Sequence, residues 1–204
     1  KVNTHFSFSL GDKSPEEALV DALQVLMEEV EIGLTHGCQI FEITDAGLDA
    51  QHMVIPDLLA VAAVKKILNQ QNKAFKSSII VNSLQITGPH QAACLLALGA
   101  QAIFARGVYL KLDDLYDDIA QKYENYCQAL EKSLLKTMGK LGITDVNNYI
   151  NGQFIAALGL DLVNTSNAIS LASLFGRLYS PLKGIQLSHV AHGLLSSLMH
   201  LQHG

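Results

Sequence analysis

The first candidate for chemistry is the tetrapeptide Thr44-Asp45-Ala46-Gly47. It follows the apolar segment from Cys38 to Ile43. The carboxylate of Asp45 could orient a ligand hydroxyl, and Gly47 completes this candidate site. The same carboxylate could instead cap the following turn, as Asp side chains often do through their own backbone. Both interpretations stay open on the sequence.

A second group of candidates lies between Ser83 and the start of the next apolar helix, at Thr87-Gly88-Pro89-His90. Free N–H groups at a helix start can hold an anion. Pro89 has no N–H, however, and the segment contains no lysine or arginine, so a plain helix cap is the alternative. The candidate ligand-binding residues are therefore Asp45, Gly47, Ser83, Thr87 and Gly88. No residue is assigned a catalytic role.

Several chemistries lack their signatures in this sequence. It contains neither a glycine-rich dinucleotide or P-loop motif nor a GxSxG motif. Cys38, Cys94 and Cys127 lack metal-binding spacing, so we expect no metal site and a reducing, cytoplasmic compartment. No carboxylate or cysteine lies nearby to complete a zinc site with the histidines of the last helix, which are His189, His192, His200 and His203.

The composition is apolar and mildly acidic. Hydrophobic residues make up 49% of the 204 residues, charged residues make up 16%, and the net charge is -5. With only 14 Lys plus Arg and no basic run, nucleic-acid binding is not expected. No apolar run reaches the roughly 18 residues of a membrane span, so no membrane partner is expected. The apolar excess indicates either an unusually large core or faces that a partner or neighbouring domains would cover.

Apolar periodicity predicts alternating strands and helices over the first part of the chain. The predicted strands are residues 4–10, 38–43, 78–81 and 102–105. Such alternation is typical of an α/β fold, here a parallel sheet of about four βα units with right-handed crossovers. Half of an eightfold barrel and an open twisted sheet are both compatible with it. In either case ligands bind at the carboxyl ends of the strands, where the candidate residues lie.

The second part of the chain is predicted to be helical. An apolar stripe predicts one long helix over residues 112–141, and glycines then break residues 143–188 into short helical pieces. A final helix is expected from Leu187 to Leu201. We therefore expect a βα region over residues 1–142 and a helical C-terminal region over residues 143–204 packed on it, within one domain.

The order of several blocks resembles glutamate synthase large subunits, in the domain just before their flavin barrel. Residues 42–64 are similar to the family pattern S-D-R-G followed by A-P-I-P-x-L-L-A-V. Residues 131–144 resemble K-G-L-L-K-x-M-S-K-M-G-I-S, and residues 149–160 resemble Y-R-G-A-Q-I-F-E-A-x-G-L. The resemblance extends over residues 5–200 in the same order and at similar spacing.

The resemblance implies a central domain that links an amidotransferase domain to an FMN barrel. FMN and the iron–sulfur cluster would then belong to a neighbouring domain, with no cofactor in this chain. The implied partners are other domains or subunits of a glutamate synthase-like assembly, with self-association as the alternative. The implied setting is glutamate biosynthesis and nitrogen metabolism.

Departures from the family pattern fall mainly on polar positions. The arginine of S-D-R-G is Ala46 here, the arginine of Y-R-G-A-Q is Ile150, and the acid of V-E-S-G is Asn82. Alanine and isoleucine cannot replace the donors of a guanidinium. This pattern favours a non-catalytic linking domain. The alternatives are a stand-alone binding or assembly module and a small-ligand enzyme that uses the strand-end loops.

Overall fold

The computed structural model describes residues 1–7, 13–49, 52–152, 154–163, 168–176 and 178–203, and a parallel sheet lies at its centre. The strands pair in the order β1-β3-β5-β6. Their bounds are Val2–Asn3 for β1, Ile40–Thr44 for β3, Ser78–Ser83 for β5 and Ala102–Ala105 for β6. Each pairs in parallel with its neighbour. The prediction of an α/β fold with four parallel strands is confirmed.

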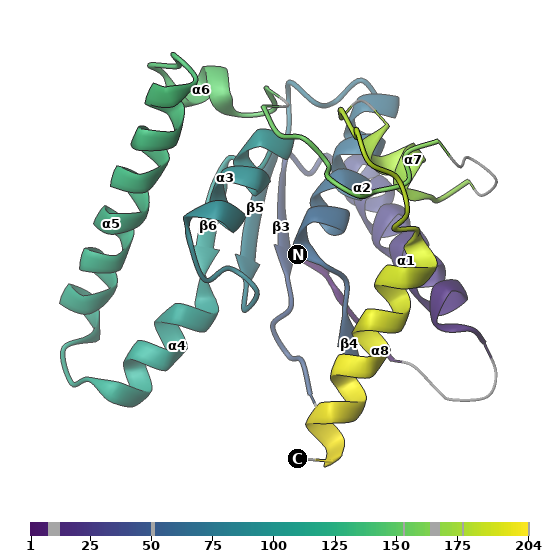
Figure 1. Ribbon diagram of the computed structural model, residues 1–204, viewed down its shortest axis with the longest axis horizontal. Helices are drawn as coiled ribbons and strands as arrows, with labels where there is room; N and C mark the ends of the chain where they lie inside the picture. Colours follow the sequence, from purple (N-terminus) through teal and green to yellow (C-terminus); the bar gives the residue numbers. More distant parts are fainter. Residues whose placement is uncertain (8–12, 50–51, 153, 164–167, 177, 204) are drawn as a thin grey trace.

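Three crossover helices connect these strands and cover one face of the sheet (Figure 1). They are α1 (Pro15–Thr35), α2 (Asp57–Gln70) and α3 (Pro89–Leu98). Helix α1 packs on α2, and α2 packs on α3. The strand order advances in one direction, without the reversal of a doubly wound sheet, and crossovers of one hand then place every helix on the same side. This order agrees with the half-barrel arrangement.

The helices begin and end at the residues that the sequence marks. The Ser14 Oγ accepts a hydrogen bond from the Glu17 N–H at 3.2 Å, and the Glu17 carboxylate accepts one from the Ser14 N–H at 2.7 Å. This reciprocal capping box satisfies two donors at the start of α1. Helix α3 ends at Gly99, whose φ of 117° lies in the left-handed region that glycine adopts without strain.

The two faces of the sheet differ in their cover. Phe41, Ile43, Ile79 and Val81 point toward the helices and are buried. Along β3 and β5 the opposite face, which we call the uncovered face, carries side chains that are exposed or half-buried: Ile40, Glu42, Ile80 and Asn82. On β6 the same face is covered, because the Phe104 ring packs against Tyr109 and Tyr123. Ile40 is 64% exposed, and the Asn82 amide donates to the Glu42 carboxylate at 2.8 Å. The main core therefore lies on the helix side of the sheet.

Of the strand predicted over residues 4–10, residues 5–7 form a strand of a second sheet, and residues 8–10 lie outside the described part. The first strand of the parallel sheet is instead β1, which the prediction missed. After β1, the short strand β2 (His5–Ser7) pairs in antiparallel fashion with β4 (His52–Val54). Thr4 connects the two sheets, since its N–H donates to the Thr44 carbonyl at 2.9 Å and its carbonyl accepts from the Ile55 N–H at 2.8 Å. Strands of either kind of sheet alternate their side chains with the same period of two, so periodicity could not tell one sheet from the other.

The single helix predicted over residues 112–141 is wrong, because the structure has two helices there. They are α4 (Arg106–Leu115) and α5 (Ile119–Lys140), which pack against each other beside β6 (Figure 1). The backbone is extended at Tyr116, and the Asp118 carboxylate accepts from the Gln121 N–H at 3.4 Å. Asp is a favoured helix N-cap, so it starts a new helix. The apolar spacing continues across the break, which hid it.

The last part of the chain packs on the helix side of the sheet. It contains α6 (Val146–Tyr149), α7 (Leu171–Phe175) and the final helix α8 (Leu187–His203). Helix α7 contacts α2, and α8 contacts α1 and β4. Between the helices, isolated bridges join Ala156 to Tyr179 and Leu160 to Ile185. The division of the chain at residue 142 stays a prediction.

A close backbone approach at Gly107 gives a first test of this packing. A Cβ at Gly107 would lie 2.7 Å from the Leu84 carbonyl oxygen and 3.2 Å from its Cα. We expect Gly107→Ala to lower the free energy of unfolding, measured with urea, by about 1–3 kcal/mol, because backbone atoms cannot move aside cheaply.

Gly139→Ala in α5 is the matched control for that substitution. A Cβ there meets nothing within 4 Å. Alanine is the better helix former, so this variant should be neutral or more stable by up to about 1 kcal/mol. Equal destabilisation of both variants would contradict the close approach of α4 to the end of β5.

Candidate functional site

The carboxyl ends of three strands meet at the side chain of Asp45, directly after β3. This side chain is 1% exposed. Its Oδ2 accepts hydrogen bonds from the Leu84 N–H at 2.9 Å and from the Ser83 hydroxyl at 3.2 Å. Its Oδ1 accepts from Nη2 of Arg106, the first residue after β6. One carboxylate thus connects the ends of β3, β5 and β6.

A second carboxylate, that of Asp57 at the start of α2, lies next to this connection and is 7% exposed. The Gln85 amide donates to Asp57 Oδ1 and to the Ile55 carbonyl, both at 3.2 Å, and its oxygen accepts from the Asp57 N–H at 3.4 Å. The Gln85 N–H donates to the Ser83 Oγ at 3.0 Å. We call these five residues the strand-end cluster: Asp45, Asp57, Ser83, Gln85 and Arg106.

The two carboxylates of the strand-end cluster have different electrostatic surroundings. Burial raises the pKa of Asp57 from 3.8 to about 6, and the nearby charge of Asp45 acts in the same direction. A hydrogen bond with Ser83 partly opposes this rise. Asp45 instead faces the guanidinium of Arg106, whose side chain is 18% exposed. Arg106 Nε is buried without a hydrogen-bond partner among the described residues.

The structure brings together two of the five residues that the sequence singled out, Asp45 and Ser83. Gly47 lies in the exposed turn after β3 with a φ of 91°. Thr87 is exposed, and its Oγ1 accepts from the Gln91 amide at 3.3 Å. Gly88 is the N-cap of α3. A ligand-binding role for these residues stays a prediction.

Sequence reasoning missed Arg106, Asp57 and Gln85. Arg106 is one of two arginines in the chain and directly follows the fourth strand, and a buried Asp needs a positive partner. Those two facts together could have indicated Arg106 as the partner of Asp45. A guanidinium therefore lies beside Asp45, although residue 46 is alanine where the resemblance leads one to expect arginine.

Among the described residues, no three His, Cys, Asp or Glu side chains are grouped so that they could hold a metal ion. Cys38 is exposed, and Cys94 and Cys127 are half-buried free thiols. In the same described part of the chain, no helix combines the length and the apolar character needed to cross a bilayer.

Fold and site together define an α/β domain with a singly wound parallel sheet whose strand ends are joined by buried polar side chains. The profile of the family described as glutamate synthase central domain matches residues 1–161. The chain therefore belongs to the glutamate synthase central-domain family.

Curated relatives agree with this assignment. The chain is 30% identical over 187 residues to the chloroplastic ferredoxin-dependent glutamate synthase of Spinacia oleracea, an alignment of 80% of this chain and 11% of that protein. It is 31% identical over 175 residues to ferredoxin-dependent glutamate synthase 2 of Synechocystis sp., and this alignment covers 74% of this chain and 11% of that protein. It is 29% identical over 153 residues to the glutamate synthase [NADPH] large chain of Bacillus subtilis, and this alignment covers 71% of this chain and 10% of that protein. The chain thus spans about a tenth of the length of these relatives.

Removal of the guanidinium tests the role of the Asp45–Arg106 pair. Arg106→Met keeps much of the side-chain volume but leaves the Asp45 carboxylate buried without its cation. We expect the free energy of unfolding at pH 7 to fall by about 3–5 kcal/mol, as for other buried pairs that lose one partner. Lys132→Met on the exposed face of α5 is the control, expected to change stability by less than about 0.5 kcal/mol. A loss no larger than that of the control would contradict the pairing.

The pKa of Asp57 gives a pH-dependent test. Because this pKa is raised from 3.8 to about 6 in the folded state, its contribution to stability is fully present below pH 3.8 and is lost as the pH rises through 6. Asp57→Asn keeps an acceptor for Gln85 but cannot ionise. Relative to the parent, the variant should therefore gain stability between about pH 4 and pH 6, by an amount on the order of 2 kcal/mol. Urea unfolding at several pH values measures it, and a pH-independent difference would contradict the shift.

Proposed function

We propose that this chain is a non-catalytic linking domain of a glutamate synthase-like protein. In that role it holds an ammonia-producing amidotransferase domain and an FMN barrel in register for glutamate biosynthesis. The observation that supports this proposal most strongly is the state of Asp45. At the end of the sheet where ligands commonly bind, its carboxylate is buried and accepts hydrogen bonds from three donors of the chain itself.

A general acid or base must reach its substrate within hydrogen-bond distance. Asp45 is 1% exposed and Asp57 is 7% exposed, and each is bonded to side chains of neighbouring elements. These bonds hold strands and a helix together and leave little of either carboxylate for a substrate. The geometry of the strand-end cluster therefore favours a structural role over the small-ligand enzyme.

The exposed apolar side chains support contact with other protein. The uncovered face includes Ile40, and the α4–α5 pair adds Leu115 and Leu135, which are 61% and 62% exposed. Helix α4 is described throughout and has no buried residue, while Met138 alone is buried in the fully described α5. Apolar patches of this kind commonly mark interaction sites. The same surfaces would serve the second candidate, a stand-alone assembly module that self-associates.

The proposal assigns FMN and the iron–sulfur cluster to neighbouring domains and none to this chain. The possible metal ligands of this chain support that assignment for the iron–sulfur cluster, because the three cysteines of the chain are not gathered into a metal-binding group. The free thiols support a reducing compartment, and the proposal places the protein in the cytoplasm.

An association experiment tests the linking role. The chain and the segments encoded on either side of it in its own reading frame would be produced separately, mixed, and examined by size-exclusion chromatography with light scattering. We expect a stoichiometric complex, because the uncovered face would lose its contact with water. Ile40→Ser should weaken the complex by about tenfold, since a fully buried isoleucine contributes about 1.5–3 kcal/mol.

Val25→Ser on α1 is the matched control for Ile40→Ser. Val25 is 55% exposed and lies on a helix, away from the uncovered face of the sheet. This variant should associate like the parent chain. A chain that dimerises and ignores the flanking segments would support the assembly module instead, and a chain that stays monomeric beside them would contradict both candidates.

A further inference from the structure

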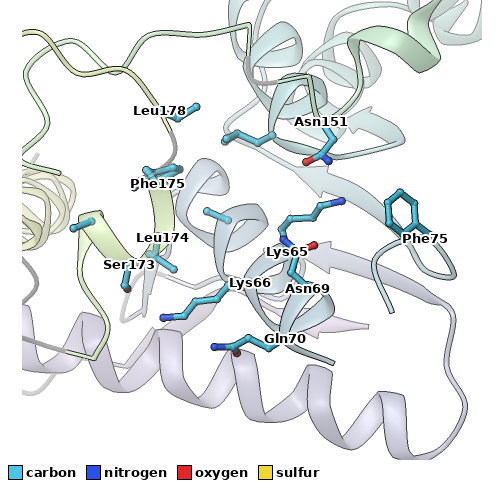
Figure 2. A pocket seen from close by; sticks show the side chains of 14 residues that line it. Lys65, Lys66, Asn69, Gln70, Phe75, Asn151, Ser173, Leu174, Phe175 and Leu178 are labelled. Atoms are coloured by element: carbon cyan, nitrogen blue, oxygen red, sulfur yellow. The ribbon is translucent and has the colours of Figure 1, made fainter. Parts of the chain in front are cut away.

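A cavity of about 540 Å³ lies at the opposite end of the sheet from the strand-end cluster (Figure 2). The last turns of α2 form its floor, residues 172–176 with α7 form one wall, and Leu98 and Asn151 border it. These parts of α2 and α3 directly precede β5 and β6, so they lie by the amino ends of the strands. The volume is in the range of small-molecule sites in proteins.

The charge of this cavity is opposite to that of the chain. Two lysines, Lys65 and Lys66, line it, and the described lining residues include no Asp or Glu. The chain as a whole carries a net charge of -5. Lys66 is held at the border, where its Nζ donates to the Ala168 carbonyl at 3.2 Å. A local excess of positive charge in an acidic protein favours an anionic occupant.

Lys65 is the central group of the cavity. Its stem lies against Gly99, where a Cβ would be only 3.3 Å from Lys65 Nζ. The side chain is half-buried, and burial lowers its pKa from 10.5. Within the described residues Lys65 makes no hydrogen bond or ion pair. A half-buried ammonium without a carboxylate partner is costly, and an anion in the cavity would offset that cost.

Neutral donors lie beside this ammonium, and an apolar wall lines another part of the same cavity. Figure 2 shows the Lys65 side chain directed toward Asn151 and Phe75, with Asn69 beside it. Asn151 has a φ of 61°, a left-handed conformation that Asn adopts more readily than most residues. Leu174 and Phe175 add apolar surface. An inorganic anion would leave the apolar surface without a contact. A carboxylate on a short hydrocarbon chain would contact both the Lys65 ammonium and the apolar surface.

We propose that this cavity is a binding site for a small organic carboxylate, whose charged group pairs with Lys65 and the Asn151 amide while its hydrocarbon part packs on Phe175 and Leu174. This site is separate from the strand-end cluster and does not depend on the linking role. The competing explanation is structural. Lys65 belongs to α2, but its ammonium group lies beside Gly99 at the C-terminal end of α3, where the helix dipole favours a cation.

Pentanoate and its neutral analogue pentanamide distinguish the two explanations. In isothermal titration calorimetry at constant ionic strength, the chain should bind pentanoate and should not bind pentanamide. Lys65→Gln should weaken pentanoate binding by about tenfold or more, because a charge-assisted hydrogen bond is lost. Lys132→Gln on α5, outside the cavity, should leave binding unchanged. Circular dichroism establishes that each variant is folded.

A second variant keeps the test decisive if Lys65→Gln fails to fold. Asn151→Asp places a negative charge in the cavity wall without altering Lys65, and Asp tolerates the left-handed backbone. It should also weaken pentanoate binding by about tenfold. Absence of pentanoate binding by the parent chain, or equal loss in Lys132→Gln, would overturn the proposal. Phosphate binding as tight as that of pentanoate would overturn the assignment to an organic carboxylate.

Discussion

The buried carboxylate of Asp45 is the constraint on which the rest of this fold depends. A carboxylate without water is unstable unless charge and hydrogen bonds replace its hydration. The chain supplies the Arg106 guanidinium, the Ser83 hydroxyl and the Leu84 N–H, from two neighbouring strand ends. Each donor must arrive at the same place, so the ends of β3, β5 and β6 are fixed relative to one another. Gly107 permits this geometry by letting the backbone of α4 approach Leu84.

The buried polar cluster and the cavity lie at opposite ends of the sheet. The carboxyl ends of parallel strands commonly hold ligands, but here the polar groups bind one another. The amino ends carry the cavity with Lys65, whose ammonium makes no ion pair among the described residues. The uncovered face of the sheet and the α4–α5 pair present apolar surface to the outside. The strand-end cluster, the cavity and the exposed apolar surface therefore lie in three different parts of the domain.

Local signals mark the start of α1 and the end of α3 in the sequence, whereas contacts between distant residues were harder to foresee. Ser14 and Gly99 define helix ends through bonds within a few residues, so their sequence context suffices. Asp45 and Ser83 converge because carboxyl ends of parallel strands share an edge, which topology implies. The pairing of Asp45 with Arg106 spans 61 residues, and nothing local at either residue specifies the other. Asp118 carried a capping signal that the continuous apolar stripe concealed.

Asp45 and Arg106 are expected to act as one structural unit. A double-mutant cycle with Asp45→Asn, Arg106→Met and the double variant measures their coupling directly from urea unfolding at pH 7. We expect a coupling energy of about 1.5–3 kcal/mol, with the double variant more stable than additivity allows because it leaves no buried unpaired charge. Additive losses, within about 0.5 kcal/mol, would show two independent residues and contradict the claim.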